Sequence, residues 1–237
     1  LFHGFGQDHS AFDSWLKTFA NEFTFYSFDL FFHGKSEWRT SGMLEKEDWQ
    51  KILTLFFEKE NLSNVIVAGF SLGAKFALAT IELFPAQVKK VIFIAPDGIK
   101  LNFWYKVATS FSLARLVFKK FVTFPQPFFW LLKILDFFRL TNKFLLRFAH
   151  SQMNTIEKRK KVYNSWVYFR RLKFDIESLA VIINKNRIEI TIIMGRYDKV
   201  IPLRRVELFV KKISLMKFHI LETGHNDLIE RSKTLIK

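Results

Sequence analysis

One pentapeptide constrains the fold of this chain more than any other part of its sequence. Residues 69–73 read Gly-Phe-Ser-Leu-Gly, follow the apolar run 65–68 and precede a segment of helical periodicity. This order predicts a buried strand, a very sharp turn at Ser71 and then a helix. A turn this sharp strains the backbone of Ser71, and side chains at Gly69 and Gly73 would collide with the strand or the helix. The pattern therefore favours an α/β fold that presents Ser71 at the tip of a turn, although an ordinary serine at a helix start is the alternative.

The rest of the chain alternates between short strands and longer helices. The expected strands are residues 24–29, 64–69, 90–95, 189–194 and 217–222, and the expected helices are residues 11–21, 44–59, 72–84, 203–213 and 226–236. This alternation is typical of a mostly parallel sheet flanked by helices. A chain of 237 residues is long enough to bury a core without disulfide bonds. The absence of cysteine also excludes thiolate zinc sites and cysteine nucleophiles.

A helical insertion interrupts the alternation. Residues 97–178 contain no convincing strand, so we expect a first core segment at 1–96, an insertion at 97–178 and a second core segment at 179–237. The insertion carries 16 Lys or Arg against 5 Asp or Glu, together with 19 of the 41 aromatic residues. A compositional bias of the whole sequence would spread these residues evenly. Their concentration therefore favours a role for the insertion, with compositional bias as the alternative.

The net charge of +15 is typical of proteins that meet nucleic acid, an anionic membrane or an acidic protein. Because no recognised nucleic-acid module is present, we do not expect nucleic acid as a partner. Within residues 128–150, charged side chains recur every three or four positions and predict one polar stripe on an apolar helix; they are Lys133, Asp136, Arg139, Lys143 and Arg147. Such a helix packs on the core, forms a groove for an acyl chain or docks on anionic lipid.

A second basic segment and the hydropathy pattern bear on partners and location. Residues 158–161 read Lys-Arg-Lys-Lys, which is an ordinary solvated charge run or a surface that steers an acidic carrier protein. No apolar run approaches the roughly 20 residues that cross a bilayer, and the first residues do not resemble a signal peptide. We therefore expect a cytoplasmic protein, with peripheral membrane association as an alternative.

A reactive Ser71 requires two further residues. A serine hydroxyl is a weak nucleophile until a base removes its proton, and that base is usually a histidine oriented by a carboxylate. His225 follows the last expected strand and Asp198 follows the strand before it, so both lie where active sites of open α/β sheets assemble. Asp97, after the strand at 90–95, is an alternative acid. We favour Asp198 because its Gly-x-x-Asp-x-x-x-Pro context matches the commoner arrangement.

The first residues of the chain supply a candidate for stabilising an oxyanion. Residues 3–8 read His-Gly-Phe-Gly-Gln-Asp, and the glycines allow the backbone to turn beneath a substrate carbonyl. A developing oxyanion is usually stabilised by backbone N–H groups. The N–H groups of Phe5 and of Leu72, which follows Ser71, form the natural pair, with His3 and Gly4 supporting the loop.

With these residues assembled, the chain resembles the α/β-hydrolase fold superfamily over nearly all of its length. The segment 3–6 looks like the family's oxyanion motif, Ser71 its nucleophile elbow, Asp198 its acid after the seventh strand and His225 its base. Residues 29–36 resemble the family's Asp-x-Pro-Gly-x-Gly-x-Ser loop, with Phe31 and Phe32 in place of Pro and Gly, a departure that concerns the local turn. The insertion is then similar to the helical lid of the family.

The resemblance implies an activity and a substrate class. It implies a serine hydrolase that cleaves a small-molecule carboxylic ester with an apolar acyl or alkyl group, through a Ser-His-Asp triad and an acyl-enzyme, with no cofactor and no metal. A serine nucleophile argues against the dehalogenase and epoxide-hydrolase branches. The combination of His-Gly-aromatic-Gly with Gly-aromatic-Ser-Leu-Gly most resembles carboxylesterases of the pimeloyl-carrier methyl esterase group.

Several alternatives remain open within this resemblance. Thioesterase, amidase, lipase, C–C hydrolase and acyltransferase reactions all run on the same residues, and a non-catalytic homologue that binds lipid or a protein partner also keeps the fold. In the family, the third strand lies inside the sheet, and only Leu1 and Phe2 of it are present here. We therefore expect that an N-terminal segment supplying the first strands is missing from this sequence.

Overall fold

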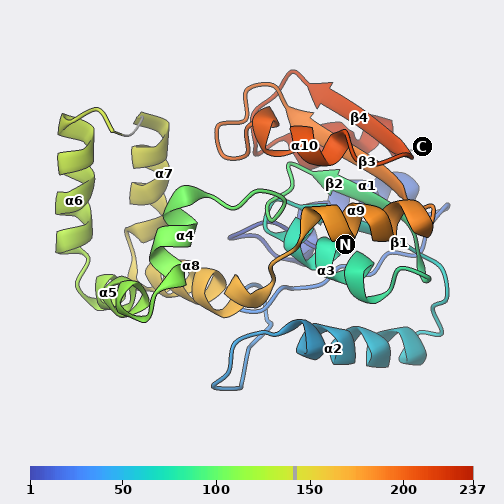
Figure 1. Ribbon diagram of the computed structural model, residues 1–237, viewed down its shortest axis with the longest axis horizontal. Helices are drawn as coiled ribbons and strands as arrows, with labels where there is room; N and C mark the ends of the chain where they lie inside the picture. The colour runs from blue at the N-terminus through green and yellow to red at the C-terminus, as the bar shows by residue number, and fades with distance from the viewer. Residues whose placement is uncertain (141–142, 237) are drawn as a thin grey trace. The chain divides into compact units, whose positions relative to one another are not determined.

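The computed structural model describes residues 1–140 and 143–236, which form two compact units (Figure 1). Unit 1 comprises residues 1–39, 44–100 and those from 171 onward, and unit 2 comprises residues 40–43 and 101–170. Unit 2 thus corresponds in the chain to residues 101–170 of the insertion that we expected at 97–178.

A parallel sheet forms the centre of unit 1. Its four strands lie in the order β1 (Val65–Phe70), β2 (Val88–Ile94), β3 (Glu189–Gly195) and β4 (Met216–Leu221), and every neighbouring pair is parallel. The carboxyl halves of β1, β2 and β3 are fully buried. Continuous burial is expected for parallel strands with helices on both faces. The predicted α/β class, with a mostly parallel sheet flanked by helices, is confirmed.

The strand expected at residues 24–29 is wrong. Within the described residues, this segment makes only one isolated parallel bridge, between Phe28 and Phe2, and Phe2 makes a second such bridge to Gly69 of β1. A strand requires a ladder of backbone hydrogen bonds to a partner, whatever its side chains prefer. The aromatic composition of residues 24–29 therefore predicted a strand, but the β-pairing of this segment does not continue beyond one bridge.

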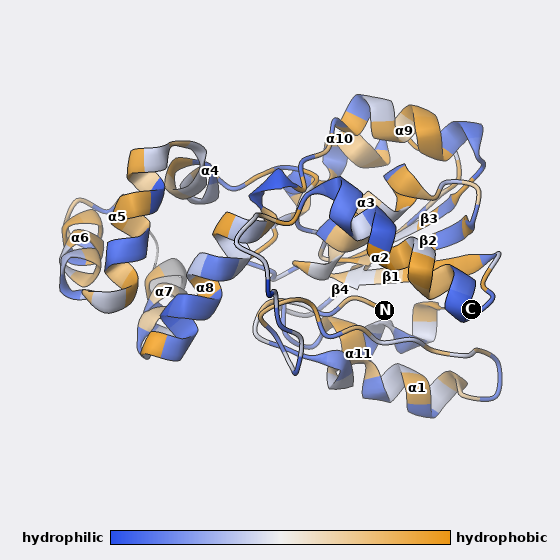
Figure 2. Cartoon of the chain, turned by 90° about the horizontal axis from the view of Figure 1, so that it is seen from below, coloured by the Kyte–Doolittle hydropathy of each residue, from blue (hydrophilic) through white to orange (hydrophobic). Residues whose placement is uncertain are grey.

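Helices cover both faces of the sheet in unit 1 (Figure 2). On one face lie α1 (Asp13–Phe19) and α11 (Leu228–Ser232), and on the other lie α2 (Lys46–Lys59), α3 (Gly73–Leu83) and α9 (Ile176–Lys185). The α3 helix is buried from Gly73 to Ile81, as its alanine-rich sequence allows. The α2 helix begins with a capping box between Glu45 and Asp48, which satisfies backbone N–H groups that have no partner within the helix.

Short 3-10 turns replace parts of two expected helices. The helix expected at 203–213 is divided into η3 (Leu203–Arg205) and α10 (Glu207–Val210), and the helix expected at 226–236 is divided into α11 and η4 (Lys233–Leu235). The remaining turns are η1 (His9–Phe12) and η2 (Phe169–Arg171). Such turns are common at helix ends, where the hydrogen-bond pattern tightens.

Among its described residues, the regular secondary structure of unit 2 is entirely helical. It contains α4 (Phe103–Ser110), α5 (Ser112–Thr123), α6 (Gln126–Phe137), α7 (Lys143–Met153) and α8 (Ile156–Tyr168). The single helix expected over 128–150 is wrong, because α6 ends at Phe137. Arg139 adopts a left-handed conformation with φ of 53°, its N–H donates to Asp136 O, and the N–H of Leu140 donates to Leu135 O. These two bonds form a Schellman ending, here with arginine at the position that usually holds glycine.

The structure bears on two predictions for unit 2, the polar stripe of residues 128–150 and the basic run 158–161. Because α6 and α7 are separate helices, the expected stripe does not follow one helix, and the side chain of Lys143 lies outside the described residues. In the basic run, Arg159 is buried and donates to Val122 O at 2.8 Å and Met153 O at 2.9 Å. Arg159 therefore joins α8 to the carboxyl ends of α5 and α7 instead of lying in solvent. Among the described helices, none combines the length and apolarity that crossing a membrane requires.

Candidate active site

Ser71 lies in the turn between β1 and α3. Its φ is 49°, a left-handed conformation that residues other than glycine rarely adopt. The Ser71 N–H donates to Ile94 O of β2, and Ser71 O accepts from the N–H groups of Ala74 and Asp97 at 3.0 Å. Surrounding backbone hydrogen bonds thus hold the strained residue in place, as strained conformations require.

The two glycines beside Ser71 are required by close backbone approach. A Cβ atom at Gly69 would lie 2.8 Å from Ala74 Cα at the start of α3. A Cβ atom at Gly73 would lie 2.0 Å from the carbonyl oxygen of Phe2. Both distances are far below contact distance, so neither position admits a side chain without movement of the backbone.

The structure brings Ser71, His225 and Asp198 together. Ser71 Oγ lies 3.1 Å from His225 Nε2, and His225 Nδ1 lies 2.6 Å from Asp198 Oδ2. His225 is carried by the loop after β4 and Asp198 by the loop after β3. A carboxylate only accepts hydrogen bonds, so Nδ1 carries the proton of the second bond. In a neutral imidazole this leaves Nε2 free to accept the proton of the Ser71 hydroxyl.

Asp198 is held from both sides of its carboxylate. Its side chain is fully buried, and Oδ1 accepts the N–H groups of Val200 and Ile201 at 2.8 and 2.9 Å. Only Oδ2 is therefore turned to His225. The Phe70 ring also packs against the His225 imidazole, with a centroid distance of 4.8 Å. The imidazole is thus oriented by one hydrogen bond and one aromatic contact.

Asp97, the alternative acid, has different contacts. It follows β2, and its Oδ2 lies 3.4 Å from Nζ of Lys75, whose side chain is almost fully buried in α3. The structure therefore pairs His225 with Asp198 and pairs Asp97 with Lys75. Burial lowers the pKa of the nearby Arg205 guanidinium, while Asp97 and Asp198 both act to raise it.

The Lys75 side chain was not singled out from the sequence. A single cation in the mostly apolar segment 73–81 is the signal that marks it, since a buried ammonium group requires a charged or polar partner.

The loop after Phe2 contains Phe5, one of the two residues whose N–H groups were expected to donate to an oxyanion. Leu30 N–H donates to His3 Nε2 at 3.0 Å, so Nδ1 bears the proton and donates to Gly4 O at 2.7 Å. Buried His3 thus ties its own loop to the segment after residue 28. In the described part of the chain, no hydrogen-bond acceptor pairs with the N–H of Phe5 or that of Leu72.

Residues 29–36 keep a tight turn despite the two phenylalanines. Phe32, at the position of the family's glycine, has φ of 68°. Asp29 accepts His9 N–H at 2.7 Å and Lys35 N–H at 3.0 Å, and it also pairs with the His9 ring. Partial burial acts to raise the pKa of Asp29, but these hydrogen bonds outweigh it and lower the pKa to about 2. The carboxylate thus closes the turn that the phenylalanines disfavour.

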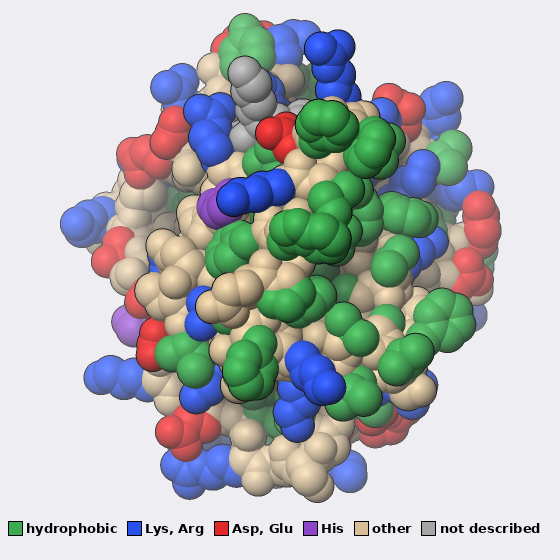
Figure 3. All heavy atoms as spheres, turned by 90° about the vertical axis from the view of Figure 1, so that its left-hand side faces the viewer, with side chains coloured by type: hydrophobic (Ala, Val, Ile, Leu, Met, Phe, Trp, Pro, Cys, Tyr) green, Lys and Arg blue, Asp and Glu red, His purple; other side chains and the backbone are tan. Residues whose placement is uncertain are grey.

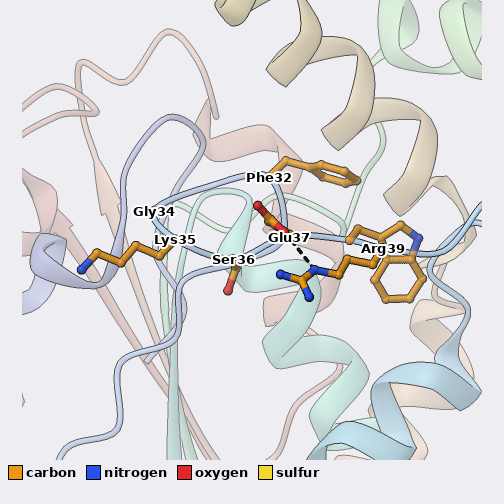
Figure 4. Close-up of a pocket in the computed structure, with 7 residues that line it drawn as sticks. Phe32, Gly34, Lys35, Ser36, Glu37 and Arg39 are labelled. Atoms are coloured by element: carbon orange, nitrogen blue, oxygen red, sulfur yellow. Dashed lines mark hydrogen bonds and ion pairs between the residues drawn. The ribbon is translucent and has the colours of Figure 1, made fainter.

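The pocket shown in Figure 4 is separate from the Ser71 group. It has a volume of about 410 Å³ and is lined by residues 32 and 34–39, where Glu37 and Arg39 form an ion pair. Ser71, His225 and Asp198 are not among its lining residues. In the described residues, no group of three or more His, Asp or Glu side chains is placed to hold a metal ion.

Comparison with curated proteins identifies two related sequences from Mycoplasma genitalium. The protein named "Putative esterase/lipase 2" is 24% identical over 237 residues, which cover 94% of this chain and 80% of that protein. The protein named "Putative esterase/lipase 1" is 38% identical over 82 residues, which cover 34% of this chain and 31% of that protein.

Solved structures and a family model agree on the fold. An esterase from Thermogutta terrifontis matches with a TM-score of 0.70 and 17% identity, covering 99% of this chain and 85% of that chain. An enol-lactonase from Burkholderia xenovorans LB400 matches with a TM-score of 0.65 and 14% identity, covering 99% of this chain and 86% of that chain. The family model described as alpha/beta hydrolase fold matches residues 1–232. The chain therefore belongs to the α/β-hydrolase fold family.

Proposed function

We propose that the protein is a serine hydrolase that cleaves a carboxylic ester through a Ser71–His225–Asp198 triad. The hydrogen-bonded chain from Ser71 Oγ through the His225 imidazole to the buried Asp198 carboxylate carries this proposal. The names of the Mycoplasma genitalium relatives support an ester as the bond that is cleaved.

In the first half of the reaction, His225 Nε2 accepts the proton of Ser71 while Oγ attacks the acyl carbon. The N–H groups of Phe5 and Leu72 donate to the carbonyl oxygen as it gains negative charge. Asp198 stabilises the imidazolium that forms and keeps its ring oriented. When the bond to the alcohol breaks, His225 returns the proton to the alcohol oxygen, and the acyl group remains on Ser71.

In the second half, water takes the place of the alcohol. His225 removes a proton from the water, whose oxygen attacks the acyl carbon of the acyl-enzyme. The bond to Oγ breaks, His225 returns the proton to Ser71, and a carboxylic acid leaves. Every proton moves through His225, and no atom changes its oxidation state, so the cycle requires no redox partner.

The substrate carries an apolar acyl or alkyl group in this proposal, as expected from the sequence. Unit 2 occupies the position in the chain, between β2 and β3, that a lid occupies in the family, and we propose that role for it. A series of p-nitrophenyl esters of increasing acyl length is expected to show kcat/KM rising beyond acetate. A maximum at acetate would contradict the apolar substrate.

A fluorophosphonate probe tests the chemistry directly, because it phosphonylates an activated serine. We expect covalent labelling of the folded protein and none of Ser71→Ala, with equal circular dichroism spectra for the two proteins. Equal labelling of both would overturn the proposal, as would absence of labelling in the folded protein. Parallel assays with an acyl thioester of the same chain length separate an esterase from a thioesterase.

A further inference from the structure

Unit 2 exposes an unusual number of large apolar side chains. Of the 23 that are exposed among the described residues, 14 belong to unit 2. Seven of these are at least 67% exposed and define what we call the α4–α6 surface: Phe103, Phe111, Leu113, Phe124, Trp130, Phe137 and Leu140. Monomeric soluble proteins rarely expose apolar groups at this density without a partner. The surface therefore requires an occupant.

The exposure follows helical periodicity on α5. Leu113, Leu116, Val117 and Phe124 are exposed at spacings of three, four and seven residues, which places them along one side of the helix axis. The opposite side carries Phe118, which is buried and packs edge-on against Tyr163 and Trp166. One side of α5 thus packs against other residues of unit 2, and the other apolar side of the helix is exposed.

Cations lie among these apolar groups. Residues 101–170 contain 13 Lys or Arg and 2 Asp or Glu. Lys119 and Lys120 on α5 and Lys133 on α6 are exposed. Figure 3 shows hydrophobic side chains gathered over the face at which α6 and α7 lie, with Lys and Arg side chains between them. The face therefore combines apolar area with positive charge.

The combination of exposed apolar side chains and positive charge favours one class of partner. Protein interfaces are depleted in lysine, and nucleic acid offers no apolar phase for exposed Phe and Leu side chains. A bilayer with anionic headgroups meets both requirements: large apolar side chains enter the headgroup–acyl boundary while Lys and Arg remain at the phosphates. We propose that the α4–α6 surface docks the protein on a bilayer containing anionic lipid. The proposal does not depend on the chemistry of Ser71.

Vesicle sedimentation tests the docking with the full chain. One set of vesicles contains phosphatidylglycerol mixed with phosphatidylcholine, and the other contains phosphatidylcholine alone. We expect binding to the anionic vesicles that is at least about tenfold tighter than to the neutral ones and that weakens as salt is raised. Equal binding to both vesicles, or no binding to either, would overturn the proposal.

Paired variants locate the surface. The double variant Trp130→Ala/Phe137→Ala is expected to bind about tenfold or more weakly, since both side chains lose apolar area that enters the boundary. The double variant Lys119→Gln/Lys120→Gln is expected to lose about fivefold for each charge removed. All four side chains are exposed, so thermal unfolding serves only to confirm that each variant is folded.

Matched controls come from unit 1. Leu55→Ala/Leu208→Ala removes side chains that are 67% and 66% exposed, and Lys51→Gln/Lys211→Gln removes two exposed charges. Both controls, and Ser71→Ala, are expected to bind vesicles as the unchanged protein does. Controls that lose as much affinity as the unit 2 variants would overturn the proposal. Self-association in gel filtration that is abolished by the Trp130/Phe137 variant, without vesicle binding, would assign the surface to a second copy instead.

Discussion

The two units differ in which side chains they bury and which they expose. Unit 1 buries polar groups such as His3, Ser71 and Asp198, each with a defined hydrogen-bond partner. Among its described residues, unit 2 buries one guanidinium group, that of Arg159, and exposes 14 large apolar side chains. Burial of polar groups is costly without partners, so unit 1 requires one defined arrangement. Exposed apolar area has a cost of its own, which a partner surface removes.

The largest effect expected in unit 1 comes from two carboxylates that follow neighbouring strands, Asp97 after β2 and Asp198 after β3. We expect Asp198→Asn to lower kcat for ester hydrolysis by about 10⁴-fold, because the imidazole loses the partner that fixes its tautomer. Asp97→Asn is expected to lower kcat by less than about tenfold, because Asp97 pairs with Lys75. Steady-state kinetics of both variants with one ester decides between the two acids. Losses of equal size, or the reverse order, would contradict the assignment.

A second prediction tests the close backbone approach that unit 1 contains. Gly73→Ala places a Cβ atom against the Phe2 carbonyl oxygen, and we expect it to lower the free energy of unfolding by about 3 kcal/mol. Gly42→Ala, in unit 2, meets Thr40 Oγ1 at 3.9 Å, which is ordinary contact. Urea unfolding compares the two. Equal stability of both variants would show that Phe2 and the Ser71 turn yield more easily than their packing indicates.

Arg159 tests whether unit 2 has a defined interior despite its exposed surface. Arg159→Met removes two charge-assisted hydrogen bonds to Val122 O and Met153 O, and we expect a loss of about 2–3 kcal/mol of unfolding free energy. Its exposed neighbour provides the control, since Lys160→Met is expected to change stability by less than about 0.5 kcal/mol. Urea unfolding and limited proteolysis measure both. If Lys160→Met costs as much as Arg159→Met, the interior assigned to Arg159 is wrong.

The smallest effect concerns pH and the turn closed by Asp29. The pKa of Asp29 is lowered to about 2 from 3.8, so its contribution to stability is present above pH 4 and is lost as the pH falls towards 2. The Asp29 hydrogen bond raises the pKa of His9, so the His9 contribution is present below about pH 6 and is lost as the pH rises through the raised value.

Thermal unfolding between pH 2 and pH 8 measures this contribution. We expect Asp29→Asn to lower the unfolding midpoint at pH 5 by about 2–4 °C and to flatten the acid part of the profile. Asp13→Asn, an exposed carboxylate on α1, is the control and is expected to leave the midpoint unchanged. An acid profile that Asp29→Asn leaves as steep as before would show that the turn does not depend on this carboxylate.

The errors of sequence interpretation share a cause. The aromatic run 24–29 has the composition of a strand, but within the described residues only Phe28 forms a β-bridge. The run 128–150 has the periodicity of one helix, but the Schellman bonds at Arg139 and Leu140 end α6. In both cases side-chain pattern predicted an element whose extent depends on backbone hydrogen bonds. Arg159 was misplaced for a similar reason, because a basic run does not show which of its members finds carbonyl partners.

The sequence alone determined what depends on neighbours in the chain. The glycines at 69 and 73, the apolar run before them and the helix after them are enough to predict the Ser71 turn, because the steric conflict that they avoid is local. The pairing of His225 with Asp198 and not with Asp97 was decided by tertiary structure. Both carboxylates follow strands, and only the positions of Lys75, Val200 and Ile201 determine which one is turned to the imidazole. The Lys75–Asp97 and His225–Asp198 contacts join distant parts of the chain, and their geometry exists only after the sheet has formed.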